Sequence, residues 1–143
     1  MKKLLLLAVL VSCISYSCIP DDSDSGADPE GPITANIRFE VVTSRSTDAI
    51  ITTTIDETTE TENVDESGLP YSKTIADVEL ESGTFIRLAF LEDGSYVVTP
   101  EGSSWTDYNV ILSIFADNVL ARTETFLVTE DDSGTKQIIL NFE

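Results

Sequence analysis

The chain has 143 residues with 8 Lys and Arg, 26 Asp and Glu and no histidine, so its formal net charge is −18 at pH 7. This length allows one domain with a single hydrophobic core, and the charge disfavours nucleic acid as a partner because the two repel each other. The only cysteines are Cys13 and Cys18, so beyond them we expect no zinc or copper site, no cofactor, no Cys or Ser/His nucleophile system and no disulfide framework.

The first 17 residues have the layout of an export signal, MKKLLLLAVLVSCISYS. Lys2 and Lys3 give it a positive start, and residues 4–11 form an uninterrupted apolar run. That run is too short to span a bilayer as a stable helix, but it has the length of the apolar part of a signal peptide. We therefore predict a lipoprotein signal peptide over residues 1–17 that takes no part in the fold.

Small residues precede both cysteines, which resembles the lipobox of bacterial lipoproteins. In that class of protein the leader is cut just before a cysteine whose thiol carries diacylglycerol. The residues LVS before Cys13 fit the common pattern of leucine and two small residues closely, and SYS before Cys18 fits it loosely. The position of the acidic segment favours Cys18, because lipidation at Cys13 would leave a spare thiol between the lipid and that segment. Cys18 is the predicted lipidation site, and Cys13 is the alternative.

The segment that starts at Cys18, residues 18–32, is acidic and rich in Ser, Gly and Pro, as flexible tethers are. It resembles the aspartate-rich segment that follows the lipidated cysteine in surface-exposed lipoproteins of some Gram-negative bacteria. Ile19 stands where aspartate is the inner-membrane retention signal in enteric bacteria. An EF-hand loop counted from Asp21 would put Pro32 at its twelfth position, where calcium needs glutamate. We therefore predict a lipid-anchored protein of the outer membrane that faces outward.

From Ile33 onward the sequence has the period of β-strands. In residues 33–43, ITANIRFEVVT, apolar and polar residues alternate. One predicted face carries Ile33, Ala35, Ile37, Phe39 and Val41. Residues 49–55, AIITTTI, are rich in β-branched side chains and follow across the turn SRSTD. The polar stretch DETTETENVDESG, residues 56–68, fits an edge hairpin or a loop.

The second half of the chain continues this pattern. LPYSKTIADVEL is extended, and Pro70 places its start at a sheet edge because proline cannot donate to a strand ladder. TFIRLAFL, residues 84–91, carries alternate buried apolar residues. YNVILSIFA and VLARTETFLV flank the turn DN at Asp117, which is a hairpin signal, and KQIILNF closes the chain.

We find no convincing amphipathic helix after the leader. Seven to eight short strands in about 110 residues predict an all-β fold, an antiparallel β-sandwich of immunoglobulin-like size. The predicted domain covers residues 33–143. The apolar phases of the strands place six residues in its core: Phe39, Ile86, Leu88, Leu112, Ile114 and Leu140.

Three stretches of this domain are SGLPYSKTI, ESGTFIRLAF and NVILSIFADNVLARTETF. Their order resembles that of the elements in MmpS-type transport accessory domains and their bacterial lipoprotein relatives: a Leu-Pro-aromatic-Ser motif, a Gly-led apolar strand and a strand that ends in a polar turn. The sequence departs from that family at Asp117 and Asn118, where Asp-Gly is usual, and in having a lipobox instead of a transmembrane anchor. The resemblance implies a β-sandwich outside the cytoplasm with a non-enzymatic accessory role.

Two groups of side chains are candidates for chemistry or binding. Asp77, Glu79 and Glu81 alternate along one strand, where paired carboxylates can act as acid and base, but any solvated strand has the same pattern. Trp105, in the loop PEGSSWTDY, is the candidate contact residue for a partner or a sugar ring. Tyr71 and Tyr108 fit core positions. Exposure of the Trp105 ring would separate a contact role from a core role.

We expect, on these grounds, a lipid-anchored module of the bacterial envelope that is not an enzyme. Its expected role is structural or protein-binding, with a protein partner in the envelope and with membrane contact through the N-terminal lipid. The alternatives are a carbohydrate- or small-ligand-binding module and a transport accessory protein. A concave face lined by aromatic residues would favour ligand binding, and an uncovered apolar strand edge would favour protein association.

Overall fold

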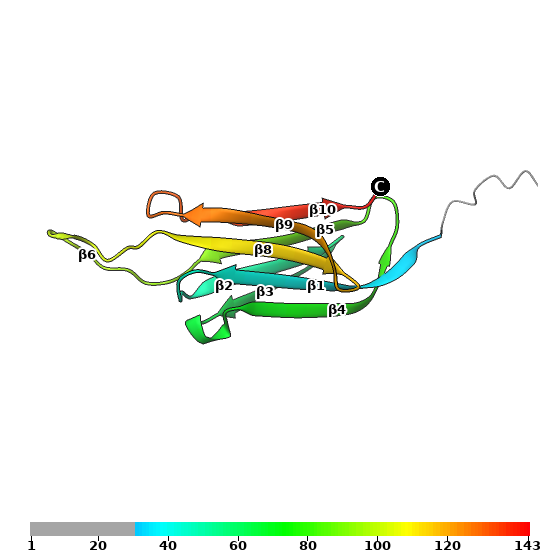
Figure 1. Ribbon diagram of the computed structural model, residues 1–143, viewed down its shortest axis with the longest axis horizontal. Coiled ribbons are helices and arrows are strands. Elements are labelled where there is room, and N and C mark those ends of the chain that lie inside the picture. Colours follow the sequence, from blue (N-terminus) through cyan, green and yellow to red (C-terminus); the bar gives the residue numbers. More distant parts are fainter. Residues whose placement is uncertain (1–30) are drawn as a thin grey trace, which may run out of the picture.

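The computed structural model describes residues 31–143, which form two antiparallel four-stranded sheets packed face to face (Figure 1). The first sheet has the order β4 (Tyr71–Leu80), β1 (Ile33–Thr43), β8 (Tyr108–Ala116) and β9 (Val119–Val128). The second has the order β10 (Lys136–Asn141), β5 (Phe85–Glu92), β2 (Ala49–Ile55) and β3 (Thr58–Val64). The short elements are the 3-10 helix η1 (Glu66–Gly68) and the paired strands β6 (Val98–Thr99) and β7 (Gly102–Ser103). The predicted all-β sandwich is confirmed.

The core lies between the two sheets and consists of inward-facing side chains at alternate strand positions. Of the six predicted core residues, five are fully buried: Phe39, Ile86, Leu88, Leu112 and Ile114. Leu140 is only half-buried because β10 is an edge strand of the second sheet. Ile33, predicted to share the buried face of β1, is 53% exposed because it is the first residue of the strand.

Turn residues in the left-handed backbone region connect two of the hairpins. Asp117 (φ 47°) and Asn118 (φ 66°) join β8 to β9, as a type I′ turn requires, and the hairpin predicted from DN is confirmed. Asp56 (φ 50°) begins the turn from β2 to β3, and its carboxylate accepts a hydrogen bond from the backbone N–H of Phe85 (2.8 Å). The polar residues 56–68 therefore contain an edge hairpin, with β3 as its outer strand.

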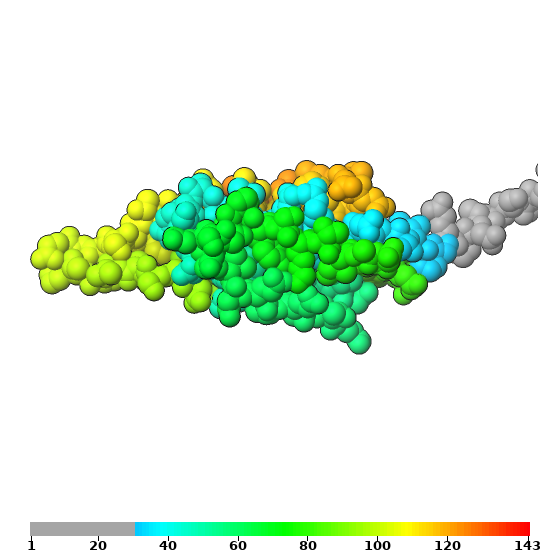
Figure 2. Space-filling view, turned by 90° about the horizontal axis from the view of Figure 1, so that it is seen from below, coloured from blue at the N-terminus to red at the C-terminus, as the bar shows by residue number. Residues whose placement is uncertain are grey.

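The sandwich is elongated, and its two ends differ in what they carry (Figure 1). Gly31, the first described residue, and the C-terminus lie at one end, which we call the proximal end. At the opposite, distal end, the connection from β5 to β8 extends well beyond the sheets as an arm (residues 93–107) that contains β6 and β7. Figure 2 shows this arm projecting from the body of the molecule. The arm and the point where the preceding chain joins the domain are thus at opposite ends.

Candidate functional site

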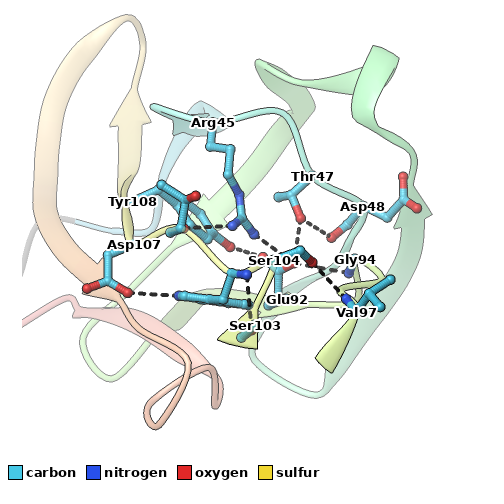
Figure 3. A network of polar contacts seen from close by, with 12 residues as sticks. Arg45, Thr47, Asp48, Glu92, Gly94, Val97, Ser103, Ser104, Asp107 and Tyr108 are labelled. Carbon is cyan, nitrogen blue, oxygen red and sulfur yellow. Dashed lines mark hydrogen bonds and ion pairs between the residues drawn. The ribbon is translucent and has the colours of Figure 1, made fainter. Parts of the chain in front are cut away.

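The base of the arm is organised around the carboxylate of Glu92, the last residue of β5 (Figure 3). The Glu92 side chain is only 5% exposed. It accepts hydrogen bonds from Thr47 Oγ1 (2.5 Å), the backbone N–H of Gly94 (3.1 Å) and the Tyr108 hydroxyl, and pairs with Arg45 Nη2 (3.4 Å). A buried carboxylate is costly unless it is paired and hydrogen-bonded. These donors meet that need and tie the β1–β2 loop, β5 and β8 together.

Arg45 also joins this cluster to the aromatic residues of the arm. Its guanidinium carbon lies 4.6 Å from the Trp105 ring centroid and 4.4 Å from that of Tyr108, both within cation–π range. Its Nη1 donates a hydrogen bond to the Thr106 carbonyl (2.6 Å). Tyr108 is itself buried, and burial together with the hydrogen bond to Glu92 raises the pKa of its hydroxyl. Arg45 and Glu92 therefore hold residues 105–108, where the arm returns to the sheet, against the sandwich.

Trp105, the predicted contact residue, is half-buried at this base and packs against the core. Its ring meets Tyr96 edge-on, with centroids 5.3 Å apart, and its Nε1 donates to Asp107 Oδ1 (2.8 Å). These contacts are sufficient to explain why a tryptophan stands here. Its role as a contact with a partner stays a prediction.

The exposed apolar residues of the arm are Tyr96, Val97 and Val98, which are 44%, 62% and 69% exposed. Val97 and Val98 follow each other on the outgoing side of the arm, and β6 begins at Val98. Sequence reasoning missed them because VVT reads as an ordinary short strand segment. In the structure both side chains are more than half exposed.

A pocket of about 590 Å³ lies at the distal end, beside the arm. Its lining residues come from the β1–β2 loop, the end of β5, the η1 region and the arm, and most carry hydroxyl or carboxyl groups: Arg45, Ser46, Thr47, Asp48, Asp65, Glu66, Ser67, Glu92, Gly94, Ser95, Tyr96 and Ser104. Asp48 and Asp65 already accept backbone hydrogen bonds around η1. The pocket therefore suits a polar ligand with several hydroxyl groups, with Tyr96 as its aromatic wall.

A second polar cluster bridges the edge strands β3 and β4. Lys73 Nζ lies 2.5 Å from Glu60 Oε2 and also contacts Glu62, and the Tyr71 hydroxyl donates to Glu62 (3.2 Å). The hydrogen bond from Lys73 lowers the pKa of Glu62, and the two glutamates raise that of Lys73. Burial and the Glu62 charge raise the pKa of Tyr71 to about 12. Glu60 and Glu62 thus pair with a lysine that faces inward from β4.

The three carboxylates considered for acid and base chemistry, Asp77, Glu79 and Glu81, are all exposed. A bulge in β4 places two residues, Ala76 and Asp77, opposite a single residue of β1, and Asp77 adopts a left-handed backbone (φ 55°). The bulge re-phases the strand, so that Val78 faces inward and Glu79 outward. Asp77 and Glu79 line a cleft beside β3 and β4 whereas Glu81 does not, so the three carboxylates do not share one cavity.

The edge strand β9 is exposed along most of its length. Val119, Leu120 and Leu127 on this strand are at least half exposed. An uncovered apolar strand edge is the feature expected of a protein-association module. None of the pockets described for residues 31–143 is lined by several aromatic residues. Tyr96 is the one aromatic residue in their linings.

Two findings on residues 31–143 concern membranes and metals. No helix in this part of the chain is long and apolar enough to cross a membrane. No group of three or more Asp and Glu side chains there is arranged to hold a metal ion. Cys13 and Cys18 lie outside the described residues, as do the signal peptide and residues 18–30 of the tether, so the lipidation site stays a prediction.

Sequence comparisons add no relative to this picture. No protein-family model matches the chain, and no curated protein matches it. The resemblance to MmpS-type accessory domains therefore stays a prediction, and function has to be argued from the site itself.

Proposed function

We propose that the protein is a lipid-anchored lipoprotein of the bacterial outer membrane that faces outward and binds another envelope or cell-surface protein through its distal arm. The observation that carries this proposal is the position of the arm at the end of the sandwich opposite Gly31. A lipid at Cys18 would hold the proximal end toward the membrane through the acidic tether. The arm, with Tyr96, Val97 and Val98 exposed, would then point away from it.

The base of the arm supports a binding role because it is built to be stiff. Glu92, Arg45 and Tyr108 fix both ends of the arm to the sandwich, and Trp105 packs beneath Tyr96. A contact surface that is already ordered loses less conformational entropy when it binds. Exposed apolar and tyrosine side chains on such a support are typical of the centre of protein interfaces.

A non-enzymatic role is supported by the chemistry of the side chains. The chain after Cys18 contains no histidine or cysteine, and the buried carboxylate of Glu92 is occupied by its own donors. The resemblance to MmpS-type domains implies an accessory role of the same kind, and transport accessory function is the narrower version of this proposal.

A second candidate function is binding of a carbohydrate or another small polar ligand. It is favoured by the pocket of about 590 Å³ beside the arm, whose lining is rich in hydroxyl and carboxyl groups. Tyr96 could stack on a sugar ring while serine and aspartate side chains bind its hydroxyls. The arm and the pocket share Tyr96, so a ligand of either kind would lie near the arm. The kind of molecule that crosslinks to the arm, protein or carbohydrate, therefore distinguishes the two functions.

The test is site-specific photo-crosslinking on intact cells. A photo-reactive residue at position 98 should form one discrete adduct of protein size, whereas the same residue at Thr34, near the proximal end, should not. Val97→Asp, with the crosslinker kept at position 98, should lower the yield about tenfold, because a charge in an apolar contact costs about 1.4 kcal/mol or more. Equal adducts from both positions, or none from position 98, would contradict the proposal. A carbohydrate adduct instead of a protein adduct would favour the second candidate.

A further inference from the structure

A cleft of about 830 Å³ opens along the side of the sandwich where β3 and β4 are the edge strands. Figure 2 faces this side of the molecule. Ile55 from β2 and Ile75 and Val78 from β4 line the cleft, and each is half-buried against the core. The cleft therefore exposes apolar surface at the side of the core, and a segment lying in it would remove that surface from water.

The rim of this cleft is acidic. Five carboxylates line it, together with one ammonium group, that of Lys73, so its formal charge is 1 − 5 = −4. The carboxyl residues are Asp56, Glu57, Glu60, Asp77 and Glu79. Lys73 is already paired with Glu60 and Glu62, and these pairs bridge β3 and β4. Among the ion pairs within residues 31–143, none involves Asp56, Glu57, Asp77 or Glu79. All four of these residues are exposed, so the basic side chains of a partner can reach them.

The backbone along the cleft is also free to pair. β3 is paired with β2 on one side only, and β4 with β1 on one side only. All seven residues of β3 pair with β2 without a register shift, whereas β4 is interrupted by the bulge at Ala76 and Asp77. A regular edge with unpaired N–H and C=O groups is a template for an added strand. β3 is therefore the better edge for such pairing.

We propose that this cleft binds an extended segment of a partner polypeptide that carries lysine or arginine at alternate positions and pairs with β3 as an added strand. Because side chains alternate along a strand, one face of the segment would cover Ile55, Ile75 and Val78 while basic side chains meet the acidic rim. Charge selects this partner over a second copy of the chain, which has a net charge of −18 and presents Glu60 and Glu62 on the same edge. The acidic tether of the chain is disfavoured for the same reason.

The test measures binding of a fluorescent octapeptide of alternating lysine and valine to the full-chain protein by fluorescence anisotropy. Glu57→Gln/Glu79→Gln should weaken binding about tenfold, or about 1.4 kcal/mol, because two ion pairs at the rim of the cleft are lost. Glu130→Gln/Asp131→Asn is the matched control, because it removes the same charge from the exposed β9–β10 connection; it should change affinity less than about twofold. Val97→Asp in the arm should leave peptide binding unchanged, so this test is independent of the function proposed for the arm.

Three further measurements separate strand pairing from charge attraction alone and from self-association. The same peptide with N-methyl groups on all of its backbone nitrogens should bind at least about tenfold more weakly, because neither of its edges can then donate hydrogen bonds to β3. Hydrogen exchange should slow in residues 58–64 when the unmodified peptide binds. Equal weakening by both variant pairs, equal binding of the methylated peptide or no binding of the lysine-valine peptide would overturn the proposal. Self-association that Glu57→Gln/Glu79→Gln strengthens would assign the cleft to a second copy and would overturn it as well.

Discussion

At the scale of single residues, the side chains that define the distal end are polar groups withdrawn from water. Glu92 is buried because its donors come from three separate segments, the β1–β2 loop, the start of the arm and β8. Replacing one such donor would leave a buried carboxylate short of a partner, which costs more than the hydrogen bond itself contributes. The cluster therefore couples the position of the arm to the packing of the sandwich.

Tyr71, the first residue of β4, supports a prediction about pH. Burial and the Glu62 charge raise the pKa of Tyr71 from 10.0 to about 12, so the unfolded chain ionises first as the pH rises. The stability that Tyr71 contributes is complete below about pH 10 and is lost as the pH approaches about 12. We expect the free energy of unfolding to fall between about pH 9 and pH 11, and Tyr71→Phe to reduce that fall.

The measurement is denaturant unfolding at the two pH values, followed by the fluorescence of Trp105, the one tryptophan of the chain. Lys73 and Tyr108, whose pKa values are also raised, account for the part of the fall that Tyr71→Phe leaves. Tyr96→Phe at the exposed arm is the control and should leave the fall unchanged. A fall of the same size in Tyr71→Phe would show that Tyr71 is not one of its sources.

At the scale of elements, the strands differ most in how far their side chains are buried. β5 and β8 are central strands with apolar residues at alternate positions, whereas β3 and β9 are edge strands whose residues are mainly exposed. The bulge in β4 and the charged residues on β3 are devices that discourage uncontrolled pairing of edges. β9 carries the charged residues Arg122 and Glu124 in its middle, but its apolar residues Val119, Leu120 and Leu127 are exposed nearer its ends. This strand is therefore a further surface for association.

The difference between central and edge strands predicts the cost of truncation. Leu88→Ala on β5 should lower the free energy of unfolding by about 2–5 kcal/mol, because it leaves a cavity in a fully buried position. Glu57→Ala, in the exposed turn between β2 and β3, should change it by less than about 0.5 kcal/mol. Leu140→Ala should fall between them because Leu140 is half-buried. Urea unfolding measures all three, and similar losses at Leu88 and Glu57 would mean that the strand phase is misassigned.

At the scale of the whole molecule, the arrangement of the two ends separates attachment from contact. Gly31 lies at the proximal end, and the arm and the pocket lie at the distal end. The cleft between β3 and β4 lies on the side of the sandwich. One anchored molecule could therefore hold a partner at its tip and a basic segment at its flank without a steric conflict.

The proposed lipid attachment predicts how the two cysteine variants distribute between membrane and soluble fractions. Acyl chains contribute about 0.8 kcal/mol for each buried methylene, so several chains on one cysteine hold a protein durably at a membrane. Cys18→Ala should release the protein from the membrane fraction or leave it unprocessed, and Cys13→Ala should leave it mature and membrane-bound. Mass spectrometry of the N-terminal peptide identifies the modified residue. Acyl chains on Cys13 would move the attachment point to that residue, and unmodified thiols at both positions would refute the lipid anchor.

Local patterns in the sequence determined the fold class and most of the core. Alternation places Phe39, Ile86, Leu88, Leu112 and Ile114 inward, and this property depends only on the strand period, so it can be predicted without knowing which strands pair. The Asp-Asn hairpin is predictable for the same reason, because a two-residue turn is a local structure.

Only the tertiary structure decided where the chemistry lies. Glu92 reads in sequence as part of the turn EDG, and Arg45 as part of the turn SRSTD, yet the two are brought together although they are far apart in the chain. Whether a carboxylate at a strand end is solvated or buried depends on which loops pack over it, and that depends on long-range pairing. The cleft follows from the order of the strands, which puts β3 and β4 at the same side of the sandwich. Sequence period determines which way a side chain faces, but the strand order determines what it meets.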